Sequence, residues 1–237
     1  MLASAGRLAR TLGILTMHVR AAIFDMDGTL IDSERVIMAA WMSASREAGI
    51  PLHASQYSRV IGLNDEESNE LLISLLGGEA EFLSVRSAAR QKLLGSPGTT
   101  VFPLKEGVRE LLGALCDRGV RCAVASSSSS AEIQERLSLA GVLHFFDATA
   151  GGNEVHRGKP DPAVYQLAAS RLGIDPMSCL AFEDSEHGAM AAAAAGARVV
   201  LVPDMKAPSQ QLAASAFAVL KSLTQAVPLV PSWFPQR

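Results

Sequence analysis

From residue 101 onward, apolar runs alternate with helical segments, and this alternation constrains the fold more than any other feature of the sequence. The runs are apolar at nearly every position, and the segments between them carry apolar residues at three- and four-residue spacing. We expect strands at 121–125, 145–150, 179–182 and 198–202, and helices at 106–118, 131–140, 162–172 and 188–195. Strands that are apolar throughout are covered on both faces, which is typical of a parallel sheet between two layers of helices. The run at 19–24 has the same character and is expected in the same sheet.

Residues 33–99 have a different pattern, which is helical with almost no strand signal. Apolar stripes of helical spacing are formed by Ile37, Ala40, Trp41 and Ala44, and by Leu71, Leu72, Leu75 and Leu76. A third helix is expected at 86–94, before Gly95-Ser96-Pro97-Gly98. The fold class is therefore α/β, a Rossmann-like parallel sheet with helices on both faces, plus an inserted α-helical cap domain.

These patterns divide the chain into an N-terminal extension at 1–18, an α/β core at 19–32 and 100–237, and a helical cap at 33–99. The extension has a faint resemblance to a targeting peptide, because it contains two arginines and no acidic residue. We favour a loose extension, or a chain that truly begins at Met17. The tail at 228–237 is expected to be peripheral.

Charge and cysteine content exclude several classes of function. The net charge is −3, there is no basic block, and aromatic residues are few, so nothing points to nucleic acid or an anionic membrane. No apolar stretch is long enough to span a bilayer. The cysteines Cys116, Cys122 and Cys179 have no Cys-x-x-Cys spacing, and we interpret them as buried free thiols of a cytoplasmic protein.

The first apolar run ends in Asp25-Met26-Asp27-Gly28. If the strand geometry continues to Asp27, the two carboxylates lie on the same side, about 7 Å apart along the backbone. Two like charges this close favour a bound cation, and a hard divalent metal prefers oxygen ligands. One carboxylate could also act as a nucleophile that forms an aspartyl-phosphate. The alternative is a turn in which Asp and Gly only supply local hydrogen bonds and a positive φ.

Polar residues also follow the other expected strands. Ser126 and Ser127 follow the run at 121–125, Lys159 lies in the loop after 145–150, and Glu183 and Asp184 follow 179–182. Each has a structural alternative: Ser126 and Asp184 could cap helices, and Lys159 could be solvated. Because ligands bind at the carboxyl ends of the strands in open parallel sheets, we expect these residues to meet at one edge.

These residues belong to four motifs that occur in a fixed order along the chain. The motifs are Asp25-Met-Asp-Gly-Thr-Leu-Ile-Asp-Ser-Glu, Ala125-Ser-Ser, Gly158-Lys-Pro-Asp-Pro, and Phe182-Glu-Asp-Ser with a Gly three residues on. This order resembles the haloacid dehalogenase-like hydrolase superfamily. The resemblance is to the branch with a helical cap after the first motif, which includes β-phosphoglucomutase-like enzymes and many small-molecule phosphatases. It covers the chain from Val19 to about Leu220.

The resemblance implies a role for each motif residue. Asp25 would be the nucleophile, and Asp27 the acid that protonates the leaving group and then the base that activates water. Mg²⁺ would be held by Asp25, Asp184 and the main-chain carbonyl of Asp27, with Glu183 supporting. Phosphate would be bound by Gly28, Thr29, Ser126, Ser127 and Lys159, the last of which would also be catalytic.

The physical chemistry supports this assignment independently. A carboxylate that attacks a phosphate dianion meets strong repulsion, so a metal ion and a lysine are needed to neutralise both. The expected activity is a Mg²⁺-dependent phosphatase that acts on a small phosphorylated metabolite.

Two other functions stay open. The mutase branch carries a His and an Arg in its cap, and the matching positions in this chain are Ile37 and Asp65, so a sugar phosphomutase is the second interpretation. A non-catalytic binding module of the same fold is the third.

Overall fold

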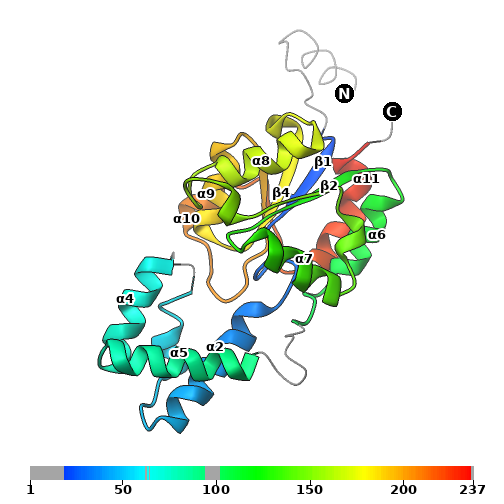
Figure 1. The fold of residues 1–237 in the computed structure, drawn as a ribbon. Helices are drawn as coiled ribbons and strands as arrows, with labels where there is room; N and C mark the ends of the chain where they lie inside the picture. Colours follow the sequence, from blue (N-terminus) through cyan, green and yellow to red (C-terminus); the bar gives the residue numbers. More distant parts are fainter. Residues whose placement is uncertain (1–18, 62, 64, 94–101, 236–237) are drawn as a thin grey trace.

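The computed structural model describes residues 19–61, 63, 65–93 and 102–235. Six strands form one sheet in the order β3-β2-β1-β4-β5-β6, and each neighbouring pair is parallel (Figure 1). The strands are β1 (Ala21–Phe24), β2 (Arg121–Ala125), β3 (Ala148–Ala150), β4 (Cys179–Glu183), β5 (Arg198–Leu201) and β6 (Ala218–Val219). The five predicted strands are present. The sixth was not predicted, although its two residues lie within the short apolar run at 216–220.

The helices follow the expected alternation. They are α2 (Ser33–Glu47), α3 (Ala54–Tyr57), α4 (Asp65–Leu76), α5 (Glu79–Leu93), α6 (Val108–Cys116), α7 (Ser130–Leu139), α8 (Ala163–Leu172), α9 (Glu186–Ala194), α10 (Gln210–Ser215) and α11 (Val230–Trp233). Short 3₁₀ helices lie at Leu143–Phe145, Gly152–Glu154, Pro176–Ser178 and Leu223–Leu229. None of the helices within the described ranges is long and apolar enough to cross a membrane.

Both faces of the sheet are covered, as the continuous apolar strands predict. On β1, Ala22 and Phe24 point into one apolar cluster with α6, α7 and α11, while Ala21 and Ile23 point into another with α8 and α9. The Phe24 and Phe182 rings stack with centroids 4.6 Å apart. Full burial of a side chain of this size stabilises a fold by about 1.5–3 kcal/mol. The prediction of an α/β sheet with helices on both faces is confirmed.

The helices α2 to α5 pack around a third apolar cluster beside the sheet (Figure 1). Trp41 on α2 stacks on Phe82 of α5 with centroids 5.9 Å apart. The helix expected to begin at residue 86 instead begins at Glu79, because Phe82 and Val85 belong to its buried face. We refer to α2–α5 as the cap. The domain limits at 18/19, 32/33 and 99/100 stay predictions, and residues 1–18 and 94–101, including the extension and the Gly95–Gly98 helix stop, lie outside the described residues.

Two further expectations were wrong. The tail is not peripheral, because Val230 and Phe234 are 1% and 3% exposed and pack in the cluster that contains α6. Their spacing of four residues places both on the side that covers the sheet. Cys116 is not buried, since it lies at the exposed end of α6, whereas Cys122 and Cys179 are buried on strands as expected.

Candidate active site

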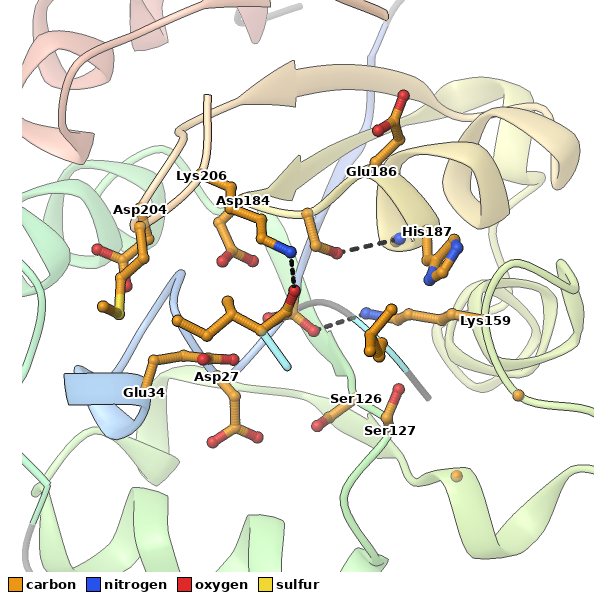
Figure 2. Close-up of a pocket in the computed structure, with 18 of the residues that line it drawn as sticks. Asp27, Glu34, Ser126, Ser127, Lys159, Asp184, Glu186, His187, Asp204 and Lys206 are labelled. Carbon is orange, nitrogen blue, oxygen red and sulfur yellow. Dashed lines mark hydrogen bonds and ion pairs between the residues drawn. The ribbon is translucent and has the colours of Figure 1, made fainter. Parts of the chain in front are cut away.

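The carboxyl ends of β1, β2, β4 and β5 border one cavity of about 830 Å³, a volume typical of small-molecule sites. Four of the predicted site residues that line it are Asp25, Asp27, Lys159 and Asp184, and Figure 2 shows Lys159 and Asp184 approaching it from different sides. Ser126 and Ser127 also line the cavity. The convergence expected from a parallel sheet is therefore present, with the cap supplying Ile61 and Leu63 on the other side.

Three carboxyl groups meet at the centre of this edge. One oxygen each of Asp25, Glu183 and Asp184 lies within 4.8 Å of the others. The Lys159 ammonium lies 2.6 Å from Asp25 Oδ1 and 2.6 Å from Glu183 Oε1, and its side chain is only 6% exposed. Lys159 is therefore not the solvated loop lysine of the alternative interpretation.

The cluster contains three carboxyl groups and one ammonium, and burial disfavours the charged form of each carboxyl group. Burial raises the pKa of Asp25 to about 8, and the charge of Glu183 adds to the rise while Lys159 opposes it. Burial, followed by the charges of Asp25 and Glu183, also raises the pKa of Asp184 well above its usual value. Burial disfavours the Lys159 cation, but its two carboxylate partners outweigh this effect and raise its pKa. A largely buried site with three carboxyl groups and one ammonium fits a divalent cation, which prefers oxygen ligands.

Local structure holds Glu183 in place. Tyr165 of α8 is fully buried and donates its hydroxyl to Glu183 Oε1 at 2.6 Å. Ser185 donates to Glu183 Oε2 at 3.1 Å and caps α9 by accepting from the Gly188 backbone at 3.1 Å. Any Cβ at Gly188 would lie 1.9 Å from Glu183 Oε1, so this position needs glycine. Because Ser185 caps α9, Asp184 is not the cap, and its side chain lines the cavity.

The turn after β1 supports Asp184. Gly28 has a φ of 88°, and an added Cβ would lie 2.2 Å from Asp184 Oδ2. Thr29 is buried and donates its hydroxyl to Asp184 Oδ1 at 3.4 Å. Neither residue is among those that line the cavity, so their predicted contact with phosphate stays a prediction.

Asp27 makes contacts that the sequence analysis missed. Its Oδ2 accepts from the Ser128 hydroxyl at 2.9 Å, and its Oδ1 lies 2.9 Å from the Arg136 guanidinium. Arg136 is also paired with Glu132 one turn earlier on α7, at 2.9 Å. The only sequence signal for Arg136 was its place on a helix that starts at the active edge.

The loop after β2 presents backbone and hydroxyl groups to the cavity. Ser126 is buried, and its Oγ accepts from the Ser128 backbone at 3.1 Å. The cap of α7 is Ser129 rather than Ser126, because Ser129 accepts from the Glu132 backbone. Gly152 lets its own backbone lie close to that of Ser127, since a Cβ at this position would lie 2.3 Å from the Ser127 carbonyl oxygen.

A second group of charged residues lines the wall toward the cap and was also missed. Glu34 lies in the first turn of α2, and Asp204 and Lys206 follow β5 (Figure 2). The Asp204 side chain is 2% exposed and lies 2.7 Å from Arg35 and 2.5 Å from Lys105. Lys206 donates to the backbone carbonyl of Ile61 in the cap. Nothing in the spacing of these residues brings the segment after β5 to the cap, so only the folded chain reveals the group.

The comparisons with known proteins agree with this geometry. A family model described as haloacid dehalogenase-like hydrolase matches residues 19–196. The phosphorylated carbohydrates phosphatase of Thermotoga maritima is 33% identical over 184 residues, which cover 75% of this chain and 82% of that protein. The β-phosphoglucomutase of Bacillus subtilis is 30% identical over 188 residues, with coverage of 75% and 80%.

A solved structure gives the same result. The haloacid dehalogenase family hydrolase of Deinococcus radiodurans, with bound phosphate and sodium, superposes with a TM-score of 0.74 and 28% identity, covering 92% of this chain and 98% of that one. The prediction of an enzyme that acts on phosphoric monoesters is supported by these relatives. The chain belongs to the haloacid dehalogenase-like hydrolase family.

Proposed function

We propose that this protein is a Mg²⁺-dependent phosphatase that hydrolyses a small phosphorylated metabolite through an aspartyl-phosphate on Asp25. One observation carries the proposal: a buried carboxylate at a strand end, 2.6 Å from a buried lysine, borders a cavity together with a second acid, Asp184. A nucleophile, a cation and a metal-binding carboxylate are the minimum that phosphoryl transfer to a carboxylate requires.

Mg²⁺ is the metal that best suits the donor set. The carboxylates of Asp25 and Asp184 and the main-chain carbonyl of Asp27 would hold it, with Glu183 supporting from behind. When bound, it would neutralise charge on the phosphate oxygens. The acid cluster fits this ion because one oxygen from each of its three carboxyl groups lies within 4.8 Å of the others. Three carboxylates also carry more negative charge than the single positive charge of Lys159 can neutralise.

The chain's own residues account for two successive displacements. In the first, an Asp25 oxygen attacks phosphorus while the bond to the leaving oxygen breaks, and Asp27 gives that oxygen its proton. In the second, Asp27 takes a proton from water, the water oxygen attacks phosphorus, and the bond to Asp25 breaks. Lys159 stays charged throughout, since its pKa is raised, and offsets charge on Asp25 and the phosphoryl group. Ser126, Ser127 and the turn at Gly28 would hold the phosphoryl oxygens.

Hydrolysis is favoured over the mutase reaction by the cap. The position where a mutase-like chain carries a His is Ile37, which packs against two apolar clusters and is not among the described residues that line the cavity. The corresponding cap loop position is Asp65, whose side chain lies outside the described residues. We therefore place a phosphatase first and a sugar phosphomutase second.

The substrate is proposed to be a phosphorylated carbohydrate, by analogy with the Thermotoga maritima phosphatase, with a phosphorylated polyol as the second candidate. The cavity volume of about 830 Å³ accommodates such a molecule. Nucleic acid is not expected as a partner, and the cytoplasmic location stays a prediction.

The test is turnover of p-nitrophenyl phosphate by the purified protein with and without Mg²⁺. We expect phosphate release that requires the metal and is lost in Asp25→Asn. Glu47→Gln is the control, because Glu47 lies on α2, is not among the described residues that line the cavity, and pairs with Lys92 and Ser43. Absence of release, together with interconversion of glucose 1- and 6-phosphates, would support the mutase. Absence of both would leave a binding module.

A further inference from the structure

The two core segments that lead into and out of the cap lie side by side. Segment 30–32 leads into α2 and segment 103–105 follows the exit from the cap, and backbone hydrogen bonds of 2.8 and 3.0 Å join these segments. The cap residues Val36, Ile37 and Leu93 pack against the core at the same end. Connections at one end permit rotation about that end, as in a hinge. A contact elsewhere is therefore needed to fix the angle of the cap over the cavity.

The segment Asp204-Met205-Lys206, which we call the strap, supplies such contacts. Figure 1 shows the orange chain after β5 extending from the sheet toward the cap. Asp204 Oδ1 lies 2.7 Å from the guanidinium of Arg35, in the first turn of α2. Met205 packs against the apolar cluster of the cap. Lys206 donates to the backbone carbonyl of Ile61, between α3 and α4 (Figure 2). Three consecutive core residues thus contact the cap at separate places.

The strap is itself attached at both ends to the edge of the sheet that carries the proposed active site. Before the strap, the Val202 N–H donates to the Glu183 carbonyl of β4 at 2.7 Å. After it, the Ser209 hydroxyl donates at 2.7 Å to Glu186 Oε1, in the first turn of α9, and Ser209 also caps α10. Hydrogen bonds on both sides make the strap a fixed part of the core.

The Asp204 carboxylate has one cationic partner in the core and one in the cap. Its Oδ1 lies 2.5 Å from Lys105, which precedes α6, and 2.7 Å from Arg35. The Lys105 side chain is 20% exposed, whereas the Arg35 side chain is 46% exposed and keeps Asp32 as a second partner at 2.9 Å. Because Arg35 stays better solvated and paired when it separates, its contact with Asp204 breaks at lower cost than the Lys105 contact.

We propose that Asp204 and Lys206 are positioning residues that hold the cap at a fixed angle, and that the cap moves by breaking the Arg35 and Ile61 contacts while the strap stays on the core. The strap lines the cavity together with Ile61 and Leu63 of the cap. One consequence rests on the proposed phosphatase function: displacement of the cap takes Ile61 and Leu63 away from the leaving group and raises KM. The position of the cap does not depend on that function.

The test measures distances between the cap and the core without substrate. Spin labels are attached to the cap at an exposed position of α5 and to the core at an exposed position of α9 or α7, through Leu83→Cys with Met190→Cys or Leu139→Cys. Cys116→Ser removes the exposed native thiol, and the remaining thiols of Cys122 and Cys179 are buried. We expect double electron–electron resonance to give one narrow distance distribution for each label pair.

Removal of the strap contacts should broaden these distributions. Arg35→Gln and Lys206→Met each remove one contact of a partly exposed cation, so each should raise the ratio of displaced to held caps by about fivefold. The two contacts involve separate residues, so the double variant should raise this ratio by about 25-fold. Arg35→Lys and Lys206→Arg keep a cationic donor and should keep the narrow distributions.

Two controls separate positioning from a general loss of ion pairs. Lys105→Gln removes the other partner of the same Asp204 oxygen but within the core, so the distributions should stay narrow even where Tm falls. Lys92→Gln removes an ion pair within the cap, 2.6 Å from Glu47, and should leave the distributions unchanged.

Kinetics of the double variant connect the position of the cap to activity. With p-nitrophenyl phosphate and Mg²⁺, we expect KM to rise by about threefold or more and kcat to stay nearly unchanged, because substrate binding selects the held cap. Lys92→Gln should change neither constant.

Every outcome bears on one part of the proposal. Unchanged distributions in the double variant, or broad distributions in the unmodified protein, would overturn it. Equal broadening in Lys105→Gln and Arg35→Gln would overturn the assignment of the moving contact to Arg35. Broadening without a change in KM would overturn the link to activity. If the unmodified protein hydrolyses no phosphate ester, the proposed function fails, while the distances still decide how the cap is held.

Discussion

The strand-end site and the cap differ in how the chain fixes them. At the strand ends, Asp25, Glu183 and Lys159 are at most 9% exposed at their side chains, and the Lys159 ammonium contacts both carboxylates. In the cap, the charged pair Lys92 and Glu47 is 31% and 63% exposed, and the described cap loop residues that reach the cavity are the apolar Ile61 and Leu63. The chemistry therefore depends on buried, mutually constrained groups, whereas the cap loop contributes apolar lining.

The largest expected contrast comes from removing one lysine in each region. Lys159→Met leaves two buried carboxylates without their cation, so we expect kcat to fall by about 10³-fold and the free energy of unfolding to fall by about 3–5 kcal/mol. Steady-state kinetics and urea unfolding measure the two effects.

Lys92→Met is the matched control in the cap. Exposed ion pairs contribute little, so we expect kcat and Tm to stay within error of the unmodified protein. Comparable losses in both variants would contradict the difference between the two regions.

Two glycines with similar backbone angles give the next contrast. Gly28 has a φ of 88° and Gly77 a φ of 96°, but a Cβ meets Asp184 only at the first position, with nothing within 4 Å of the second. Gly28→Ala should therefore raise the Mg²⁺ concentration that gives half-maximal activity by about 10–100-fold, since it displaces a proposed ligand. Gly77→Ala should lower stability by about 1 kcal/mol from backbone strain alone. A Mg²⁺ titration of each variant, with Tm alongside, separates steric displacement from strain.

Two arginines test positioning. Arg136 holds Asp27 at 2.9 Å, whereas Arg86 of α5 lies 5.0 Å from the Phe82 ring centroid in the cap. Arg136→Met should lower kcat by about tenfold, because a misplaced acid transfers its proton less efficiently, and should leave KM nearly unchanged. Arg86→Met should change neither constant. A rise in KM without a fall in kcat for Arg136→Met would argue for substrate binding instead.

The smallest effect concerns thiols, all of which lie in the sheet region. Burial raises the pKa of both Cys122 and Cys179 to about 12, so their thiolates are scarce below that pH. In the folded protein we expect a thiol reagent to modify Cys116 alone, with Cys116→Ser abolishing the reaction. Rapid modification of a second thiol under native conditions would show that the sheet region opens more readily than its burial implies.

The elements that sequence predicts well are those whose pattern is local. The five apolar strands follow from the periodicity of the sequence. Parallel-sheet geometry then predicts that Asp25, Lys159 and Asp184, which come after three of these strands, meet at one edge. Residues brought to the site by long-range packing could not be predicted. The sequence around Asp204 or Arg136 does not indicate which distant residue each one contacts. The burial of the tail was missed for the same reason, because Val230 and Phe234 pack in one cluster with α6, which is distant in the sequence.

The most direct measurement asks where the phosphoryl group goes. Acid-quenched turnover of a phosphate-labelled substrate with Mg²⁺, followed by peptide mapping, should place the label on Asp25. Asp25→Asn should carry no label and lose activity by about 10³-fold or more while keeping the unfolding transition. Near-normal turnover by Asp25→Asn, or a label on another residue, would contradict the account.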